Sequence, residues 1–432
     1  MNYFSLHYNS KPVSFDKAVI QGLAPDRGLY FPESIPTLPA SFFEQMEQLS
    51  NHQIAFEAIR PFVGDSLSEK ALQDIVEDTL QFPFPIVSIT DSIATLELFH
   101  GPTLAFKDVG ARFMARCLSH FQTTNSEKKV TVLVATSGDT GGAVADGFYE
   151  VPGIDVVILY PKGKVSEIQE KQLTTLGKNI AALEVEGTFD DCQDMVKSAF
   201  IDHQIINEVQ LTSANSINVA RWLPQMFYYF FAYKALKNRK EKLAFAVPSG
   251  NFGNICAGLM SQKMGLPIAQ FIACTNINDT VPVYLKEGVY TPKPSEQTIS
   301  NAMDVGDPSN FVRIQKIFNK DFHKLQKELK GYQFTDTATK KALQEIYKKS
   351  KYIADPHGAV GYLGLKTFME ENPNYYGLFL ETAHPIKFLD TVEKTLKTTV
   401  PVPQQIEAVL HKPKESHPIK DYKDLKAFLL SR

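Results

Sequence analysis

Lys107 is the residue of this sequence best placed to act as a nucleophilic amine. It follows Ala105 and Phe106 in the segment HGPTLAFKD, residues 100–108. An apolar setting disfavours the ammonium form, so it lowers the pKa of a lysine from about 10.4 and frees the amine for imine chemistry. The alternative is a lysine at the start of a helix with its ammonium group in water.

A second segment, directly after the apolar run 130–135, is suited to binding an anion. It contains Ser137, Gly138, Asp139 and Thr140. Small and hydroxyl residues at a strand-to-helix turn present backbone N–H groups at the positive end of a helix, which favours a carboxylate or a phosphate. Asp139 opposes a bound anion unless it bonds a donor of its own. An ordinary capped turn is the alternative interpretation.

The third segment gives the strongest single signal, and it predicts a phosphate site. Residues Gly250, Asn251, Phe252, Gly253 and Asn254 follow the apolar run 243–247 and precede a helical pattern. Glycines three apart allow close backbone approach, asparagines add donors, and a helix start favours negative charge. The segment is neither a dinucleotide fingerprint nor a nucleotide-triphosphate loop. A tight turn without a ligand is the alternative.

The fourth segment, ETAHP at residues 381–385, follows the apolar run 376–380. The hydroxyl of Thr382 could donate to a ring nitrogen, and Pro385 fixes the exit of the turn. His384 is a candidate acid or base, although a lone histidine beside a proline is more often structural.

The elements that must position these residues alternate between strands and helices. Short apolar runs predict buried strands, and helical spacing between them predicts covering helices, so the expected class is α/β with parallel sheets. Ligands of such sheets bind beyond the carboxyl ends of strands, where the four segments fall. The expected strands are residues 96–99, 130–135, 156–160, 181–185, 243–247, 271–274 and 376–381, and the expected helices are 108–121, 165–176, 217–236, 255–263, 358–371 and 391–396.

The chain divides into three predicted regions. Residues 1–80 mix short helical patterns with a turn-rich stretch and are expected to form a cap, and the Pro-containing stretch 82–85 is a plausible linker. Residues 86–390 are expected to form a core of two α/β subdomains, the smaller at roughly 105–215. Residues 391–432 are expected to form a helical tail. The lysine-rich stretch 320–351 is expected to form solvated helix faces.

Composition excludes several classes of function. With 45 Lys and Arg against 48 Asp and Glu, the net charge is −3, which disfavours nucleic acid and anionic membrane surfaces as partners. No apolar run approaches the length of a membrane helix. The four cysteines show no metal-ligand spacing, so no metal site is expected. Scattered cysteines and a start without a signal-peptide pattern favour a cytoplasmic protein.

The four segments in this order resemble the pyridoxal-phosphate enzymes of the tryptophan-synthase-β fold type (fold type II). HGPTLAFKD at 100–108 and TSGDTG at 136–141 more narrowly resemble threonine synthases, as do NSIN at 215–218, NINDTVP at 276–282, NAMDV at 301–305 and the stretch 22–32. The resemblance covers nearly the whole chain.

The resemblance implies roles for the candidate residues. Lys107 would hold pyridoxal 5'-phosphate as an imine, residues 250–254 would bind the cofactor phosphate, and Thr382 would meet the pyridine nitrogen. Residues 137–140 would receive the amino-acid carboxylate. The wider fold type usually has Asn where this sequence has Asp139, whereas threonine synthases share the Asp.

The implied reaction converts O-phospho-L-homoserine and water into L-threonine and phosphate, the last step of threonine biosynthesis. Arg112 or Arg221 could hold the substrate phosphate, and a structural ion pair is the alternative for each. A monomer or a homodimer is expected. The competing functions are a serine/threonine dehydratase or β-replacement enzyme of the same fold, which would not need a second anion pocket, and a noncatalytic relative that binds a phosphorylated ligand.

Overall fold

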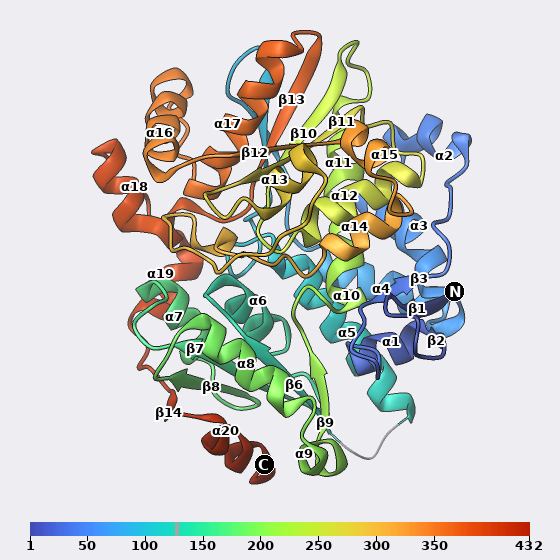
Figure 1. The fold of residues 1–432 in the computed structure, drawn as a ribbon, viewed down its shortest axis with the longest axis vertical. Coiled ribbons are helices and arrows are strands. Elements are labelled where there is room, and N and C mark those ends of the chain that lie inside the picture. The colour runs from blue at the N-terminus through green and yellow to red at the C-terminus, as the bar shows by residue number, and fades with distance from the viewer. Residues whose placement is uncertain (126–128) are drawn as a thin grey trace.

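The computed structural model describes residues 1–125 and 129–432, and it contains two largely parallel β-sheets, one above the other in Figure 1. The larger sheet has the order β12-β11-β10-β13-β5-β4, in which only β4 is antiparallel to its neighbour. Its strands are β4 (Ile86–Ser88), β5 (Ile93–Glu97), β10 (Lys242–Pro248), β11 (Gln270–Thr275), β12 (Leu329–Gln333) and β13 (Tyr375–Glu381).

The smaller sheet has the order β14-β8-β7-β6-β9, and all its pairs are parallel. Its strands are β6 (Val130–Ala135), β7 (Ile154–Pro161), β8 (Ile180–Val185), β9 (Gln210–Ser213) and β14 (His417–Ile419). The helices connecting these strands are α6 (Asp139–Gly147), α7 (Glu167–Thr174), α8 (Phe189–Ala199) and α9 (His203–Glu208).

Both sheets are buried on their two faces, which explains why their strands are continuous apolar runs. In β10, Phe245 and Val247 belong to the main core, whereas Ala244 and Ala246 pack on the opposite face with α17. The helices of the larger half are α10 (Val219–Trp222), η3 (Leu223–Met226), α11 (Phe227–Leu236), α12 (Gly253–Lys263), α13 (Thr280–Glu287), η4 (Asn301–Met303), α14 (Phe311–Ile317), α15 (Phe322–Glu328), α16 (Asp336–Ser350), α17 (Pro356–Glu371), η5 (Pro385–Phe388) and α18 (Leu389–Leu396).

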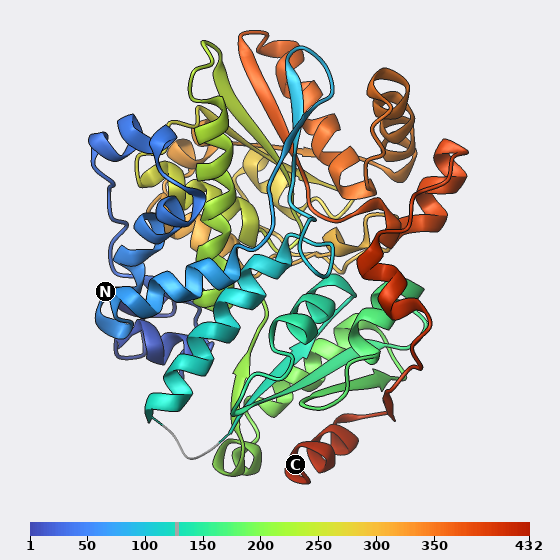
Figure 2. The ribbon, with the colours of Figure 1, turned by 180° about the vertical axis from the view of Figure 1, so that it is seen from behind.

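The N-terminal residues form a small antiparallel sheet and several helices, drawn in blue at one side of the molecule in Figures 1 and 2. The long helix α5 (Lys107–Asn125) packs against α1, α4, α6 and α10, so it joins this region to both sheets. The N-terminal elements are β1 (Asn2–Ser5), β2 (Val13–Ser14), α1 (Phe15–Gln21), β3 (Tyr30–Pro32), α2 (Ala40–Gln45), η1 (Met46–Gln48), α3 (Asn51–Val63), η2 (Gly64–Ser66) and α4 (Glu69–Thr79).

Arg313 fixes part of the N-terminal region against the larger half. It is fully buried, and its guanidinium donates to the carbonyl oxygen of Tyr30 through Nε at 3.2 Å and Nη2 at 3.0 Å. Its Nη1 donates to the carbonyl of Ser216 at 3.1 Å, and the ring of Trp222 lies 4.3 Å from the guanidinium carbon. One side chain therefore connects β3 to the segment before α10.

Two sequence expectations about the C-terminal half are wrong. The tail is not purely helical: between α19 (Gln404–Leu410) and α20 (Tyr422–Leu430), β14 pairs in parallel with β8 and extends the smaller sheet. The lysine-rich stretch 320–351 is interrupted by β12, which pairs with β11 at the edge of the larger sheet. Both are edge strands with partly exposed polar residues, so neither has a continuous apolar pattern.

Among the described residues, no helix combines the length and the apolar character that crossing a membrane would require.

Candidate active site

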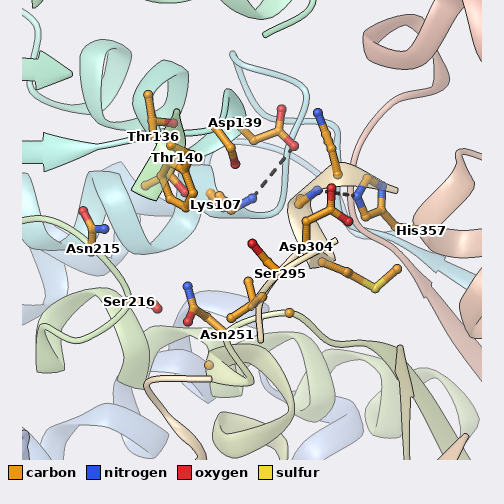
Figure 3. A pocket seen from close by; sticks show the side chains of 18 of the residues that line it. Lys107, Thr136, Asp139, Thr140, Asn215, Ser216, Asn251, Ser295, Asp304 and His357 are labelled. Atoms are coloured by element: carbon orange, nitrogen blue, oxygen red, sulfur yellow. Dashed lines mark hydrogen bonds and ion pairs between the residues drawn. The ribbon is translucent and has the colours of Figure 1, made fainter. Parts of the chain in front are cut away.

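The four candidate segments meet at one cavity of about 590 Å³ between the two sheets. It lies beyond the carboxyl ends of β6, β10 and β13, as expected for parallel sheets. Figure 3 shows Lys107 pointing into the cavity toward Asp139, with Asn251 on the opposite side. The predicted residues that line it are Lys107, Ser137, Asp139, Thr140, Gly250, Asn251, Phe252, Gly253, Asn254 and Thr382, together with Arg221.

Lys107 begins α5, and its backbone is held by the turn that carries Thr382. The N–H of Phe106 donates to the carbonyl of Thr382 at 2.9 Å, and Ala105 forms an antiparallel bridge with Ala383. The Nζ of Lys107 lies 3.9 Å from Oδ2 of Asp139. Burial lowers the pKa of Lys107, and the carboxylate of Asp139 only partly opposes this shift. The structure therefore favours a reactive amine over the alternative of a solvated ammonium.

Asp139 is buried between two lysines. Its Oδ1 accepts hydrogen bonds from Nζ of Lys387 at 2.8 Å and from Nε2 of Gln169 at 3.0 Å. Burial alone would raise the pKa of Asp139, but the charges of Lys387 and Lys107 and these hydrogen bonds lower it well below its usual range. The carboxylate is thus ionised and has donors of its own, which the sequence required of an acidic residue in an anion site.

The turn before α6 is organised by Thr136, the first residue of the segment TSGDTG, to which the sequence analysis gave no separate role. Its Oγ1 accepts from the N–H of Gly138 at 2.9 Å and from that of Gly141 at 2.8 Å. Gly138 has a φ of 137° and its missing Cβ would collide with Gln169, so glycine is required there. Gly138 does not line the cavity and shapes the turn, whereas the cavity is lined by Ser137, just before α6, and by Thr140, in the first turn of α6.

The loop between β10 and α12 has the features of a phosphate site. Phe252 adopts a left-handed conformation with a φ of 59°, and α12 starts directly after it at Gly253. A Cβ on Gly250 would lie 2.5 Å from the carbonyl oxygen of Ala302, so this position admits no side chain. Asn254 accepts from Tyr229 through Oδ1, while its buried Nδ2 has no hydrogen-bond partner within the described chain.

That unpartnered amide group allows a test of whether the cavity fits pyridoxal phosphate. A buried donor without an acceptor is costly, and a phosphate oxygen beside the start of α12 would satisfy it. Lys107 lies in the same cavity as this loop. Thr382, a buried residue with a hydroxyl group, lines the cavity from the turn after β13. An amine, a phosphate cradle and a hydroxyl are the groups that this cofactor requires, so the residues present fit it.

His384 has no place in the cavity lining. Its Nδ1 accepts from the N–H of Ile386 at 3.1 Å, which makes it the cap of η5. Burial lowers its pKa to about 4, so the ring is neutral near pH 7. The structural interpretation of His384 is therefore favoured.

The two arginine candidates for the substrate phosphate have different positions. Arg112 does not line the cavity, because its Nη2 donates to the carbonyl of Asp78 at 2.8 Å and lies 3.5 Å from Oδ1 of that residue. The expectation that Arg112 binds substrate is corrected accordingly. The helical spacing gave the distance from Lys107 to Arg112 along α5, but it did not show which face of the helix turns toward the cavity. Arg221 lines the cavity from α10 and is 3% exposed.

Arg221 is a buried cation that forms no ion pair within the described residues, although the buried carboxyl of Asp108 acts on it from a greater distance. One Nη donates to the carbonyl of Ala214, while the buried Nε has no partner in the described chain. Burial lowers its pKa to about 10, so the guanidinium remains charged near pH 7. A buried charge of this kind requires compensation, which an anionic ligand in the cavity would provide.

Three further residues near the cavity were missed as functional candidates. Asp304 and His357 line the side shown at the right of Figure 3, and Lys387 donates a hydrogen bond to Asp139 without lining the cavity. The Nε2 of His357 accepts from the N–H of Ala302 at 3.2 Å, so its Nδ1 carries the proton and donates to Asp355 at 2.8 Å. Burial raises the pKa of Asp304 to about 6. The feature of the sequence that could have identified His357 is Asp355, at which a helix starts. The sequence around Lys387 contains no feature that would have identified it.

Comparisons with known proteins agree with this geometry. The family model described as pyridoxal-phosphate dependent enzyme matches residues 91–374, more than half of the chain. A model of the threonine synthase N terminus matches residues 2–80, and one of the threonine synthase C-terminal region matches 358–429.

Individual relatives are similar over the full length. A curated threonine synthase from Buchnera aphidicola subsp. Baizongia pistaciae is 44% identical over 435 residues, covering 100% of both chains. The crystal structure of threonine synthase from Escherichia coli superposes with a TM-score of 0.94 at 42% identity, covering 100% of both chains. A threonine synthase from Brucella melitensis, solved with bound pyridoxal phosphate, gives a TM-score of 0.92 at 32% identity, covering 100% of this chain and 99% of that one.

The fold and the cavity thus define a pyridoxal-phosphate-dependent enzyme of fold type II, a lyase. Within that class, the matches at both ends distinguish the chain from dehydratases. It belongs to the threonine synthase family.

Proposed function

We propose that this protein converts O-phospho-L-homoserine and water into L-threonine and phosphate. The observation that carries the proposal is the presence, in one cavity, of Lys107 and Arg221, a buried guanidinium that forms no ion pair in the part of the chain that the structure describes. A phosphorylated substrate supplies the missing anion, whereas serine or threonine would leave the charge uncompensated.

Three groups of residues would hold the cofactor. Lys107 would bind it covalently, Thr382 would meet the pyridine nitrogen, and the loop Gly250–Asn254 with the start of α12 would bind its phosphate. The bound cofactor supplies the electron sink that permits proton loss at the α and β carbons of the substrate. The buried Nδ2 of Asn254, which has no hydrogen-bond partner among the described residues, supports this assignment of the phosphate.

The substrate carboxylate is assigned to the first turn of α6. Thr140 lines the cavity there and Ser137 lines it just before the helix, and the first N–H groups of a helix have no intrahelical acceptor. The substrate phosphate is assigned to Arg221. Substrate is then held at both ends, which orients the carbon atoms between them relative to Lys107.

Lys107 is assigned as the proton carrier. After substrate has replaced it as the covalent partner, its amine remains in the cavity and can move protons at the α and β carbons. Because burial lowers the pKa of this amine, a larger neutral fraction is available as a base near pH 7.

The test is a paired assay with purified protein and pyridoxal phosphate. Phosphate release and threonine formation from O-phospho-L-homoserine are measured beside keto-acid formation from serine and threonine. Equimolar phosphate and threonine support the proposal. Keto acid as the dominant product would favour a dehydratase, and no turnover of any of these amino acids would favour a noncatalytic relative.

Two properties of the whole protein belong to the same proposal. A cytoplasmic location is supported by Cys117, Cys192, Cys256 and Cys274, which are all buried and unpaired. A monomer or a homodimer is expected, and light scattering on the purified protein measures which of the two forms.

A further inference from the structure

Lys387 is a buried cation whose position depends on the elements that carry the site. It lies on η5, five residues after Thr382, and its side chain is fully buried. Its N–H donates to the carbonyl of His384 at 3.1 Å, and the N–H of His384 donates to the carbonyl of Leu104 at 3.0 Å. The loop before Lys107 and the turn after β13 therefore hold Lys387 in place together.

The ammonium group of Lys387 reaches across to the smaller sheet. Its Nζ donates to Oδ1 of Asp139 at 2.8 Å, and within the described part of the chain this is its one ion pair. Gln169 donates to the same oxygen at 3.0 Å, while Oδ2 of Asp139 lies 3.9 Å from Nζ of Lys107. One carboxylate oxygen is thus engaged by Lys387 and Gln169, and the other faces the reactive lysine.

This arrangement places two charges of opposite sign beside Lys107. Without Lys387, the carboxylate of Asp139 would have Lys107 as its one cationic partner and would hold that lysine in the ammonium form. The same uncompensated negative charge would oppose an anionic ligand at the first turn of α6, which Asp139 itself begins.

We propose that Lys387 is a positioning residue of the active site that neutralises the charge of Asp139. Its charge keeps the amine of Lys107 in the uncharged form and allows the first turn of α6 to accept the substrate carboxylate. The inference about the carboxylate rests on the proposed function, whereas the inference about Lys107 concerns this chain alone. Lys387 acts through Asp139 and has no place in the cavity lining.

The first test measures the protonation of Lys107 in the protein without cofactor. Acetic anhydride reacts with neutral amines, so the pH dependence of Lys107 acetylation, followed by peptide mass, reports its titration midpoint. The other charged groups that act on Lys107 are Arg221 and Asp355, and they are unchanged in every variant.

The variants have a predicted order. Lys387→Met leaves one negative charge beside Lys107, so the midpoint should rise by on the order of one pH unit. Asp139→Asn leaves one positive charge, so the midpoint should fall. The double variant removes both charges and should return close to the wild-type midpoint. Lys426→Met is the matched control, because it removes a lysine from an ion pair with Asp202 outside the cavity and should change nothing.

The order of midpoints also gives the result that would overturn the proposal. If Lys387→Met folds and its Lys107 has the same acetylation midpoint as in the wild type, Lys387 does not neutralise Asp139. If Lys387→Met does not fold, the comparison of Asp139→Asn with the double variant replaces it, and equal midpoints in those two would refute the proposal. A purely structural ion pair would change the melting temperature of the variants without this order of midpoints.

The second test separates substrate binding from the chemical step. In Lys387→Met the KM for O-phospho-L-homoserine should rise on the order of tenfold, and the double variant should recover most of that loss. An unchanged KM would overturn the inference about the carboxylate. If the wild type forms no threonine, the proposed function fails, but the acetylation midpoints still decide the role of Lys387 toward Lys107.

Discussion

Replacing Arg221 by methionine tests the most distinctive part of the cavity. Methionine keeps most of the length of the side chain and removes its charge. A hydrogen bond to a charged group contributes about 1.5–3 kcal/mol, which corresponds to a loss of roughly 10- to 150-fold in kcat/KM for O-phospho-L-homoserine. The loss should lie mainly in KM, because the phosphate is held in the ground state as well as in the transition state.

The same substitution should have little effect on stability. The carbonyl of Ala214 loses a donor, which costs about 1 kcal/mol, but the substitution also removes a desolvated guanidinium that forms no ion pair within the described residues. The two effects oppose each other, so the melting temperature should change by at most about 3 °C. Loss of affinity without loss of stability identifies a binding residue.

The assay combines steady-state kinetics with inhibition by inorganic phosphate and a thermal melt. Arg112→Met is the matched control, because Arg112 contacts Asp78 and does not line the cavity. Its kcat/KM should equal that of the wild type. An Arg221→Met enzyme with an unchanged KM and an unchanged Ki for phosphate would refute the reasoning. So would a variant that loses only cofactor affinity, because Arg221 would then bind the cofactor phosphate.

Four further predictions follow from the site. Lys107→Ala should abolish the borohydride-reduced cofactor adduct, and an adduct mapped to another lysine would contradict the assignment. Gly253→Val should weaken pyridoxal-phosphate binding in an equilibrium titration, because a Cβ there already approaches Ser216 to 3.3 Å, and an unchanged affinity would exclude the loop. Thr382→Val should cost on the order of 1 kcal/mol in cofactor binding and alter the absorbance spectrum; normal spectra and rates would remove it from the site. His384→Gln should leave the pH profile between pH 6 and 8 unchanged, because the pKa of His384 is lowered to about 4 and its ring does not titrate there.

The sequence predicted those parts of the fold that depend on local pattern. The apolar run 130–135 coincides with β6 because that strand is buried on both faces. The strand β12 was missed because Lys330, Tyr332 and Gln333 are partly or fully exposed at a sheet edge. The strand β14 was missed because His417 and Pro418 resemble a turn, and its pairing with β8 joins segments far apart in the chain.

The candidate site shows the same difference between features set by a local sequence pattern and contacts between distant segments. Lys107 and the glycine-containing loop line one cavity, as the patterns within a few residues of each indicated, and their roles there stay predictions. Lys387 could not be predicted, because its partner Asp139 lies 248 positions away in the chain. Arg112 was placed wrongly because spacing along a helix gives a distance but does not say which neighbour covers that face.

The last strand of the smaller sheet has a consequence for synthesis of the protein. While the chain emerges from the ribosome, β8 has an open edge until residues 417–419 are made, and the neighbouring strand of β5, β13, also comes late. An open parallel edge exposes unpaired N–H and C=O groups to other chains. Until residues 417–419 have left the ribosome, the nascent chain therefore exposes the edge of β8 in the half of the protein that contains α6.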